Sequence, residues 1–287
     1  MALRCSVMTG PLDALPSQPP YSELYIYYLE GRLPSRAFVN DAAFIGNWEE
    51  GGDSFLFFTQ PRNRQVQRFV EQSPQLVSVD HYHMTYAEWQ GSLPEPFSVG
   101  RLIIMPPWCD GATKPKSGSI LLDPGVVFGT GTHPTTHDCL RALQYAFDRC
   151  AIGRVLDLGT GTGLLGLAAV RLGAGQCIAV DSNRLAVETA LRNVRYNDML
   201  KQVLVVQGDA KKCIDLPCDL MVSNIQYDMM RQLVSAPGFR DIAHFILSGL
   251  LRSQALEIER QLGRCGATIL HQWTHEGIWH TFYGENA

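Results

Sequence analysis

The sequence predicts an α/β protein, with a main domain built on a mostly parallel, doubly wound sheet and a small α+β domain in front of it. From Val155 onward, short apolar runs alternate with helical patterns, which is the repeat that parallel sheets require. Near the C-terminus two apolar runs follow each other without a helix between them, which predicts an antiparallel edge. Ahead of these units, a glycine turn joins two apolar runs in the pattern of a β-hairpin.

The composition excludes several classes of protein. The chain has 287 residues, 46% of them hydrophobic, and its formal net charge of −4 does not favour a nucleic-acid or membrane-surface binder. The eight cysteines are scattered without metal-ligand spacing, so we expect free thiols and no metal site. No segment approaches the roughly 20 apolar residues of a membrane span, and the first residues lack the apolar core of a signal peptide. We therefore expect a cytoplasmic protein.

The N-terminal part divides into a flexible tail over residues 1–20, the small domain over 21–83 and a linker over 84–96. Within the small domain, alternating apolar and polar residues predict strands, and one segment has the apolar spacing of a helix. The expected strands cover Ser22–Leu29, Phe44–Glu50, Ser54–Phe58 and Leu76–Val79, and the expected helix covers Asn63–Gln72.

The main domain covers residues 97–287. Strands are expected over Phe97–Met105 and Ser119–Pro124, followed by a Gly/Thr loop in which Thr135 or Thr136 caps the next helix. The βα repeat then predicts strands near 154–158, 176–180, 202–206, 218–223 and 244–249, helices near 163–173, 183–196, 226–235 and 252–264, and closing strands over Ala267–Gln272 and His280–Tyr283.

The glycine turn in Val155–Gly163 predicts a site for a nucleotide-like ligand, because glycines let the backbone approach such a ligand closely. One hypothesis is a nicotinamide oxidoreductase, since Gly161-x-Gly163-x-x-Gly166 fits the dinucleotide fingerprint and Asp181 follows 20 residues later. In a dinucleotide site, however, the first glycine of the fingerprint ends the strand. Here an acid, Asp157, occupies the strand end instead.

Acids at the ends of three successive strands favour S-adenosylmethionine as the ligand. Asp157 offers a carboxylate to its cationic groups, Asp181 to its ribose, and Asp209 to its adenine amino group. After the fourth strand, Asn224 can accept a hydrogen bond from a substrate amine, and Tyr227 can supply an aromatic wall. Methyl transfer to an amine gains from such alignment and desolvation.

The loop Asp123–Thr136, which reads DPGVVFGTGTHPTT, resembles the signature of the PrmA family, the bacterial ribosomal protein L-11 methyltransferases. The resemblance continues through Val155–Gly163, Ser223–Ile225 and Glu276–Trp279. It implies a class I methyltransferase domain, with a Rossmann-like seven-stranded sheet whose last strand is antiparallel, behind a small ferredoxin-like domain that recruits the substrate protein. It also implies S-adenosylmethionine-dependent methylation of lysine side chains and the N-terminal amine of ribosomal protein L-11.

Carried over by position, the resemblance implies cofactor contacts from the loop and from strand ends, with Phe128 and Gly129–Thr132 covering the cofactor. Together with the acids, the predicted cofactor site contains Phe128, Gly129, Thr130, Thr136, Asp157, Gly159, Gly161, Asp181, Asp209 and Asn224. Asn224 is also the predicted catalytic residue, because it would orient the amine. His133 is expected to hold the loop by bonding to backbone, with general base as the alternative role, and Trp279 to pack beneath the terminal strands.

The sequence therefore predicts a monomeric protein N-methyltransferase that acts on ribosomal protein L-11 and binds no nucleic acid directly. Two alternatives stay open: the same chemistry on lysines of a different protein, and a non-catalytic adenosylmethionine-binding module. The small domain fits the resemblance less closely, because Arg32–Ala43 carries Pro34 and little helical periodicity where the family has a helix. We therefore expect residues 1–95 to fix the choice of substrate.

Overall fold

A computed structural model of the chain describes residues 15–34, 37–92, 94–109, 112 and 118–286. These residues form two units, one of residues 16–95 with 183–185, and one that contains the rest of the chain from residue 96 onward. Most of the expected tail, residues 1–14, lies outside the described residues. None of the helices that the structure describes is both long and apolar enough to span a bilayer.

The N-terminal unit is a four-stranded antiparallel sheet in the order β2-β3-β1-β4. Apolar residues of its strands and Val66 of α1 form one buried cluster, so the helix packs on the sheet. This strand order is ferredoxin-like, but the described residues between β1 and β2 form turns instead of a helix. The elements are β1 Glu23–Glu30, β2 Phe44–Glu50, β3 Asp53–Phe58, α1 Asn63–Glu71 and β4 Val77–Thr85.

Two segments differ from the sequence prediction. The expected linker contains α2, Tyr86–Gln90, whose first turn is held by a capping box between Thr85 and Glu88. The single strand expected over Phe97–Met105 is a hairpin of β5, Phe97–Val99, and β6, Leu102–Met105. The chain reverses there because Gly100 has a φ of +57°, which a continuous strand cannot contain. Strand β7, Ser119–Leu121, pairs with β6.

The main sheet has seven strands in the order β10-β9-β8-β11-β12-β14-β13, and only β14 runs antiparallel to its neighbours. This confirms the predicted fold class. The strands are β8 Arg154–Leu158, β9 Gln176–Asp181, β10 Val203–Gln207, β11 Leu220–Asn224, β12 His244–Leu251, β13 Thr268–His275 and β14 Trp279–Glu285. The helices are α3 Pro134–Phe147, α4 Leu164–Leu172, α5 Arg184–Tyr196, α6 Ala210–Cys213, α7 Tyr227–Ser235, the 3-10 helix Pro237–Asp241 and α8 Arg252–Cys265.

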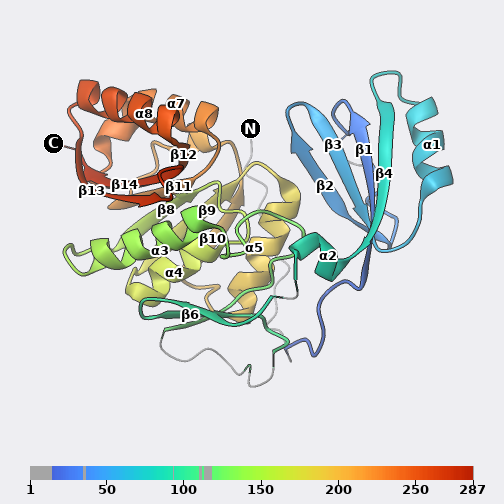
Figure 1. Cartoon of the computed structure of the whole chain (residues 1–287), viewed down its shortest axis with the longest axis horizontal. Helices are drawn as coiled ribbons and strands as arrows, with labels where there is room; N and C mark the ends of the chain where they lie inside the picture. The colour runs from blue at the N-terminus through green and yellow to red at the C-terminus, as the bar shows by residue number, and fades with distance from the viewer. Residues whose placement is uncertain (1–14, 35–36, 93, 110–111, 113–117, 287) are drawn as a thin grey trace. The chain divides into compact units, whose positions relative to one another are not determined.

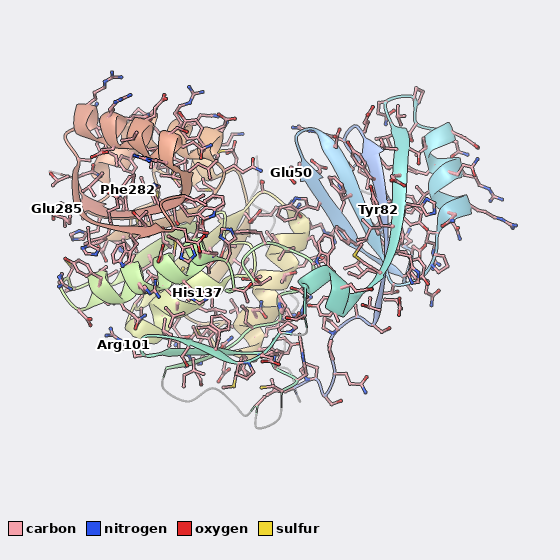
Figure 2. All side chains as sticks on the ribbon, in the orientation of Figure 1. Glu50, Tyr82, Arg101, His137, Phe282 and Glu285 are labelled. Atoms are coloured by element: carbon pink, nitrogen blue, oxygen red, sulfur yellow. The ribbon has the colours of Figure 1, made fainter. Side chains whose placement is uncertain are left out.

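Helices cover both faces of the main sheet, and two buried clusters fill the space between the layers (Figure 1). Helices α3 and α4 pack on one face, and α7 and α8 on the other. The central strand β8 is buried from Val155 to Leu158, as expected of a parallel strand that is covered on both sides. Phe282 in the middle of β14 belongs to the buried core, and the strand ends at Glu285 (Figure 2).

Candidate active site

The glycine turn after β8 is bonded to the Gly/Thr loop that precedes α3. Gly161 has a φ of +54°, and a Cβ at this position would lie 2.4 Å from the carbonyl oxygen of Phe128. Thr162 donates hydrogen bonds from its backbone nitrogen to the Phe128 carbonyl (3.2 Å) and from Oγ1 to the Gly129 carbonyl (2.6 Å). The turn and the loop therefore form a single glycine cradle, defined here as residues 123–136 and 159–163.

Helix α5 anchors the start of this loop through buried polar contacts. Asn193 accepts a hydrogen bond from the Asp123 nitrogen (2.8 Å) and donates to the carbonyls of Asp123 (2.8 Å) and Thr162 (2.9 Å). Arg192 pairs with the fully buried Asp123 at 2.7 Å, Nε to Oδ2. Asn193 was not predicted as a site residue, and its signal in the sequence is a polar residue within the apolar stripe of a helix.

Asp157, near the end of β8, is buried and accepts hydrogen bonds from the glycine turn and from the helix after it. Its Oδ2 accepts hydrogen bonds from Thr160 Oγ1 (2.6 Å) and from the Gly166 nitrogen (3.0 Å). Burial raises the pKa of this carboxyl group to about 7. Its other oxygen, Oδ1, is buried and accepts no hydrogen bond from the residues that the structure describes. A ligand cation near Oδ1 would favour the ionised form.

The other two predicted acids end neighbouring strands. Asp181 ends β9, and its Oδ2 accepts a hydrogen bond from the Gly161 nitrogen at 3.0 Å. Asp209 follows β10 and caps α6 by accepting from the Lys211 nitrogen at 3.0 Å. Because β8, β9 and β10 are adjacent and parallel, all three acids lie along the same edge of the sheet.

A hydrogen-bonded chain joins Asn224 to the loop. Asn224 ends β11, and its Nδ2 donates to Thr135 Oγ1 at 3.2 Å. His133 Nδ1 accepts a hydrogen bond from the Thr135 nitrogen and so carries no proton, which means that the Thr135 hydroxyl donates to it at 2.7 Å. No described residue donates a hydrogen bond to Asn224 Oδ1, so this oxygen is available to accept one from a ligand.

His133 is the N-cap of α3, and its Nδ1 accepts a hydrogen bond from the Thr135 nitrogen at 3.3 Å. This confirms the expectation that the imidazole holds the loop by bonding to backbone. Burial lowers the pKa of the ring, and with Nδ1 as acceptor the neutral ring carries its proton on Nε2. The expected N-cap, Thr135 or Thr136, was wrong, because Pro134 fits the first helical position, where no N–H is needed.

Aromatic rings flank this chain of hydrogen bonds. The His133 ring packs edge-on against Trp279 at a centroid distance of 5.0 Å and lies 5.7 Å from the ring of Phe128. Trp279 begins β14 and pairs with Leu251 at the C-terminal end of β12. The Trp279 ring therefore lies against the N-cap of α3, beside the Gly/Thr loop. Tyr227 begins α7 and packs against the buried cluster that this helix shares with α8, and its role as an aromatic wall stays a prediction.

Two of the predicted cofactor residues, Thr136 and Asp157, carry buried polar atoms that lack partners within the described part of the chain. Thr136 is 2% exposed, and its Oγ1, like Asp157 Oδ1, has no hydrogen-bond partner among the described residues. Buried polar atoms without partners are costly, so both atoms are suited to a polar ligand. Phe128 is half exposed above the turn, as a residue that covers a ligand would be before binding. Among the described residues, Thr130 bonds only to Thr132 of its own loop, through the two hydroxyls at 2.9 Å and from the Thr132 nitrogen at 3.5 Å.

Comparisons with known proteins agree with this geometry. A family model described as ribosomal protein L11 methyltransferase (PrmA) matches residues 62–286. A ribosomal protein L11 methyltransferase of Gloeobacter violaceus is 36% identical over 271 residues, which cover 92% of this chain and 80% of the relative. The enzyme of that name from Exiguobacterium sibiricum is 37% identical over 61% of this chain, and the alignment spans 56% of the relative's length.

A solved structure shares the fold. The ribosomal protein L11 methylase of Lactobacillus delbrueckii subsp. bulgaricus superposes with a TM-score of 0.57 and 27% identity. The superposition covers 68% of this chain and all of that protein.

Proposed function

Because the chain belongs to the ribosomal protein L11 methyltransferase (PrmA) family, we propose that it transfers methyl groups from S-adenosylmethionine to amines of ribosomal protein L11. One observation carries the proposal: the family's loop is bonded onto the glycine turn, beside the free amide oxygen of Asn224. The targets would be lysine side chains and the N-terminal amine.

Residues of the cradle and of the strand ends beside it would hold the cofactor. Thr136 and Asp157 offer their unpaired oxygens, and Asp181 stands at the end of the second strand. The buried oxygens suit a ligand with cationic and hydroxyl groups. When bound, S-adenosylmethionine supplies the methyl group as an electrophile.

The chain's own residues would orient the amine. Asn224 Oδ1 accepts the amine N–H, while Thr135 fixes the other end of the amide through the bond from Nδ2. Phe128, His133 and Trp279 provide aromatic surface that excludes water from an amine. His133 does not serve as the base in this arrangement, because its Nδ1 already accepts two hydrogen bonds and its Nε2 is protonated.

The test uses purified ribosomal protein L11 and tritiated S-adenosylmethionine. We expect wild type to label L11, Asn224→Ala to lower kcat by roughly 100-fold, about 2.7 kcal/mol in the activation free energy, and the surface variant Gln202→Ala to match wild type. Calorimetry should show binding of S-adenosylhomocysteine and none of NADH. Binding of NADH alone would contradict the proposal, and so would an Asn224→Ala variant as active as wild type.

A different protein substrate is the second candidate, and one observation favours it. The family match begins at residue 62, so β1, β2 and β3 of the N-terminal unit lie outside it. If this unit recruits the substrate, a difference in these strands would change which protein is methylated. Labelling a lysate from a strain that lacks this protein distinguishes the two: a labelled band other than L11 supports the second candidate.

A further inference from the structure

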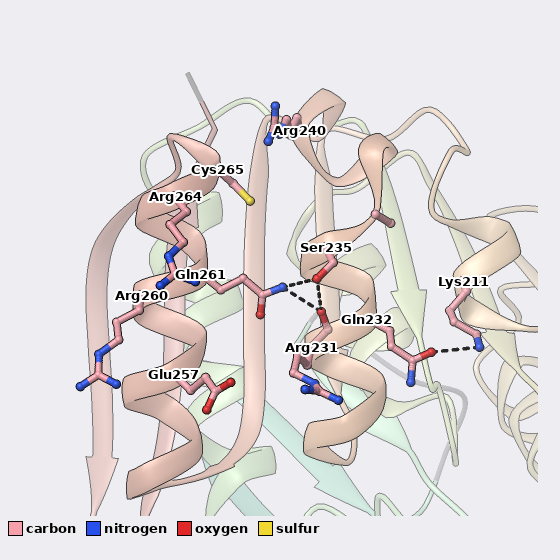
Figure 3. Close-up of a pocket in the computed structure, with 11 residues that line it drawn as sticks. Lys211, Arg231, Gln232, Ser235, Arg240, Glu257, Arg260, Gln261, Arg264 and Cys265 are labelled. Carbon is pink, nitrogen blue, oxygen red and sulfur yellow. Dashed lines mark hydrogen bonds between the residues drawn. The ribbon is translucent and has the colours of Figure 1, made fainter.

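The main domain carries a hollow, the basic groove, between α7 and α8. Its volume is about 990 Å³, and it shares no lining residue with the candidate active site. Five of its lining side chains are positively charged and one is negatively charged: Lys211, Arg231, Arg240, Arg260 and Arg264, against Glu257. Figure 3 shows these side chains along the two facing helices and the segments beside them.

Neutral groups, not ion pairs, hold the walls of the groove together. Gln261 of α8 reaches across to α7, where its Nε2 donates to the Arg231 carbonyl at 3.0 Å and to the hydroxyl of Ser235 (Figure 3). Lys211 Nζ donates to Gln232 Oε1 at 3.1 Å. The described bonds that join α7 to α8 therefore use uncharged groups, and none of them engages a guanidinium group.

No described carboxylate pairs with any of the four arginines. Glu257, the one acid among the described lining residues, lies near the Tyr227 phenol, whose pKa burial and the Glu257 charge both raise. Helix-dipole compensation accounts for Arg264 in the last turn of α8, but not for Arg231 in the middle of α7. The groove thus concentrates unpaired positive charge in a chain whose net charge is −4.

The kinds of side chain in the lining select among anionic partners. The planar guanidinium groups of arginine and the side-chain amides of glutamine donate hydrogen bonds that phosphate oxygens can accept. The lining contains no aromatic residue on which an unpaired base could stack, so single strands are not favoured. Its apolar members are Ala236 and Cys265, too small to anchor a protein segment at the centre of an interface.

We propose that the basic groove binds the phosphate backbone of double-helical RNA. The choice of RNA rests on the proposed function, because a ribosomal protein is a substrate found beside helical RNA. Composition alone does not predict such binding, since net charge averages over the whole chain while the five cations are gathered on one surface.

The experiment is a titration of a fluorescent RNA hairpin with the full chain, followed by anisotropy at several salt concentrations. If all five cations contact phosphates, the logarithm of the association constant falls against the logarithm of salt concentration with a slope of about −4.5. The variant R231Q/R260Q/R264Q should reduce this slope to about −2 and weaken binding at least about tenfold. The matched variant R64Q/R68Q/K201Q, which removes three exposed cations elsewhere, should bind as wild type does.

Binding of S-adenosylhomocysteine by both variants shows that each is folded. An equal slope for wild type and the groove variant would overturn the proposal, as would displacement of the hairpin by a polyglutamate peptide of equal charge. A DNA duplex that binds through the same residues supports backbone contact, because such contact carries no sequence information. If L11 is not methylated while groove-dependent duplex binding persists, the proposed function fails and the groove proposal stands for helical nucleic acid.

Discussion

Replacing Gly161 by alanine tests whether the Gly/Thr loop and the glycine turn depend on each other. Gly161 has a φ of +54°, a conformation that costs an L-residue about 1–2 kcal/mol. The new Cβ would lie 2.4 Å from the Phe128 carbonyl oxygen, so the loop must move. That movement breaks the two hydrogen bonds from Thr162 to the loop, each of which contributes about 0.5–1.5 kcal/mol. We expect Gly161→Ala to lower the free energy of unfolding by about 2–5 kcal/mol.

Two glycines in and after α8 provide matched controls in the same domain. Gly266 has a φ of +84°, but no atom lies within 4 Å of its added Cβ, so Gly266→Ala carries only the conformational cost of about 1–2 kcal/mol. Gly263 is helical and open, so Gly263→Ala should raise the free energy of unfolding by about 0.5–1 kcal/mol. Urea unfolding measures the three differences, and calorimetry with S-adenosylhomocysteine measures the affinity of each variant.

The expected order is that Gly161→Ala loses most, Gly266→Ala less, and Gly263→Ala gains. Only Gly161→Ala should weaken the binding of S-adenosylhomocysteine, by at least about tenfold in the dissociation constant or 1.4 kcal/mol, because only this variant displaces the loop. If Gly161→Ala costs no more than Gly266→Ala and binds the ligand normally, the close approach of Phe128 does not constrain the turn. The description of turn and loop as one cradle would then be wrong.

Two further results are expected. Because the pKa of Asp157 is raised, the native state keeps a proton that the unfolded chain releases above about pH 4. The free energy of unfolding should therefore fall as pH rises from 4 to 7, by at most about 1.4 kcal/mol per pH unit, and level off above pH 7. In urea unfolding at several pH values, Asp157→Asn should flatten this dependence, and an unchanged slope would contradict the prediction. Asn193→Ala removes three buried hydrogen bonds and should lower the free energy of unfolding by about 2–4 kcal/mol, whereas a loss below 1 kcal/mol would show that α5 does not anchor the loop.

The regular part of the fold could be predicted from sequence because its signal is local. Strands such as β8 and β12 are short apolar runs bounded by polar residues, and the helices between them have clear apolar spacing. The predicted ends of strands and helices were wrong where the backbone conformation of a single residue decides them. Gly100 divides an apolar run that otherwise looks continuous, and Pro134 moves the start of α3 ahead of the threonines.

The candidate site divides in the same way. Asp157 and Asp181 could be found because each ends a strand, and strand ends share one edge of a parallel sheet. Asn193 could not, because it acts on a loop 70 residues earlier in the chain, through contacts that only the tertiary structure creates. The contact between Trp279 and His133 could not be predicted either, because it depends on the register of β14 against β12. The contacts of the ten cofactor residues stay predictions until a ligand is bound.

Strand β14 has a consequence for how the protein is made. It follows β12 and β13 along the chain but lies between them in the sheet, so β13 has no path of hydrogen bonds to the other strands until residues 279–285 have been synthesised. A nascent chain that stops before β14 leaves the exposed edge of β12 open to wrong pairing. It also lacks the Trp279 ring beside His133, so completion of the sheet and completion of the aromatic surface are the same event in synthesis.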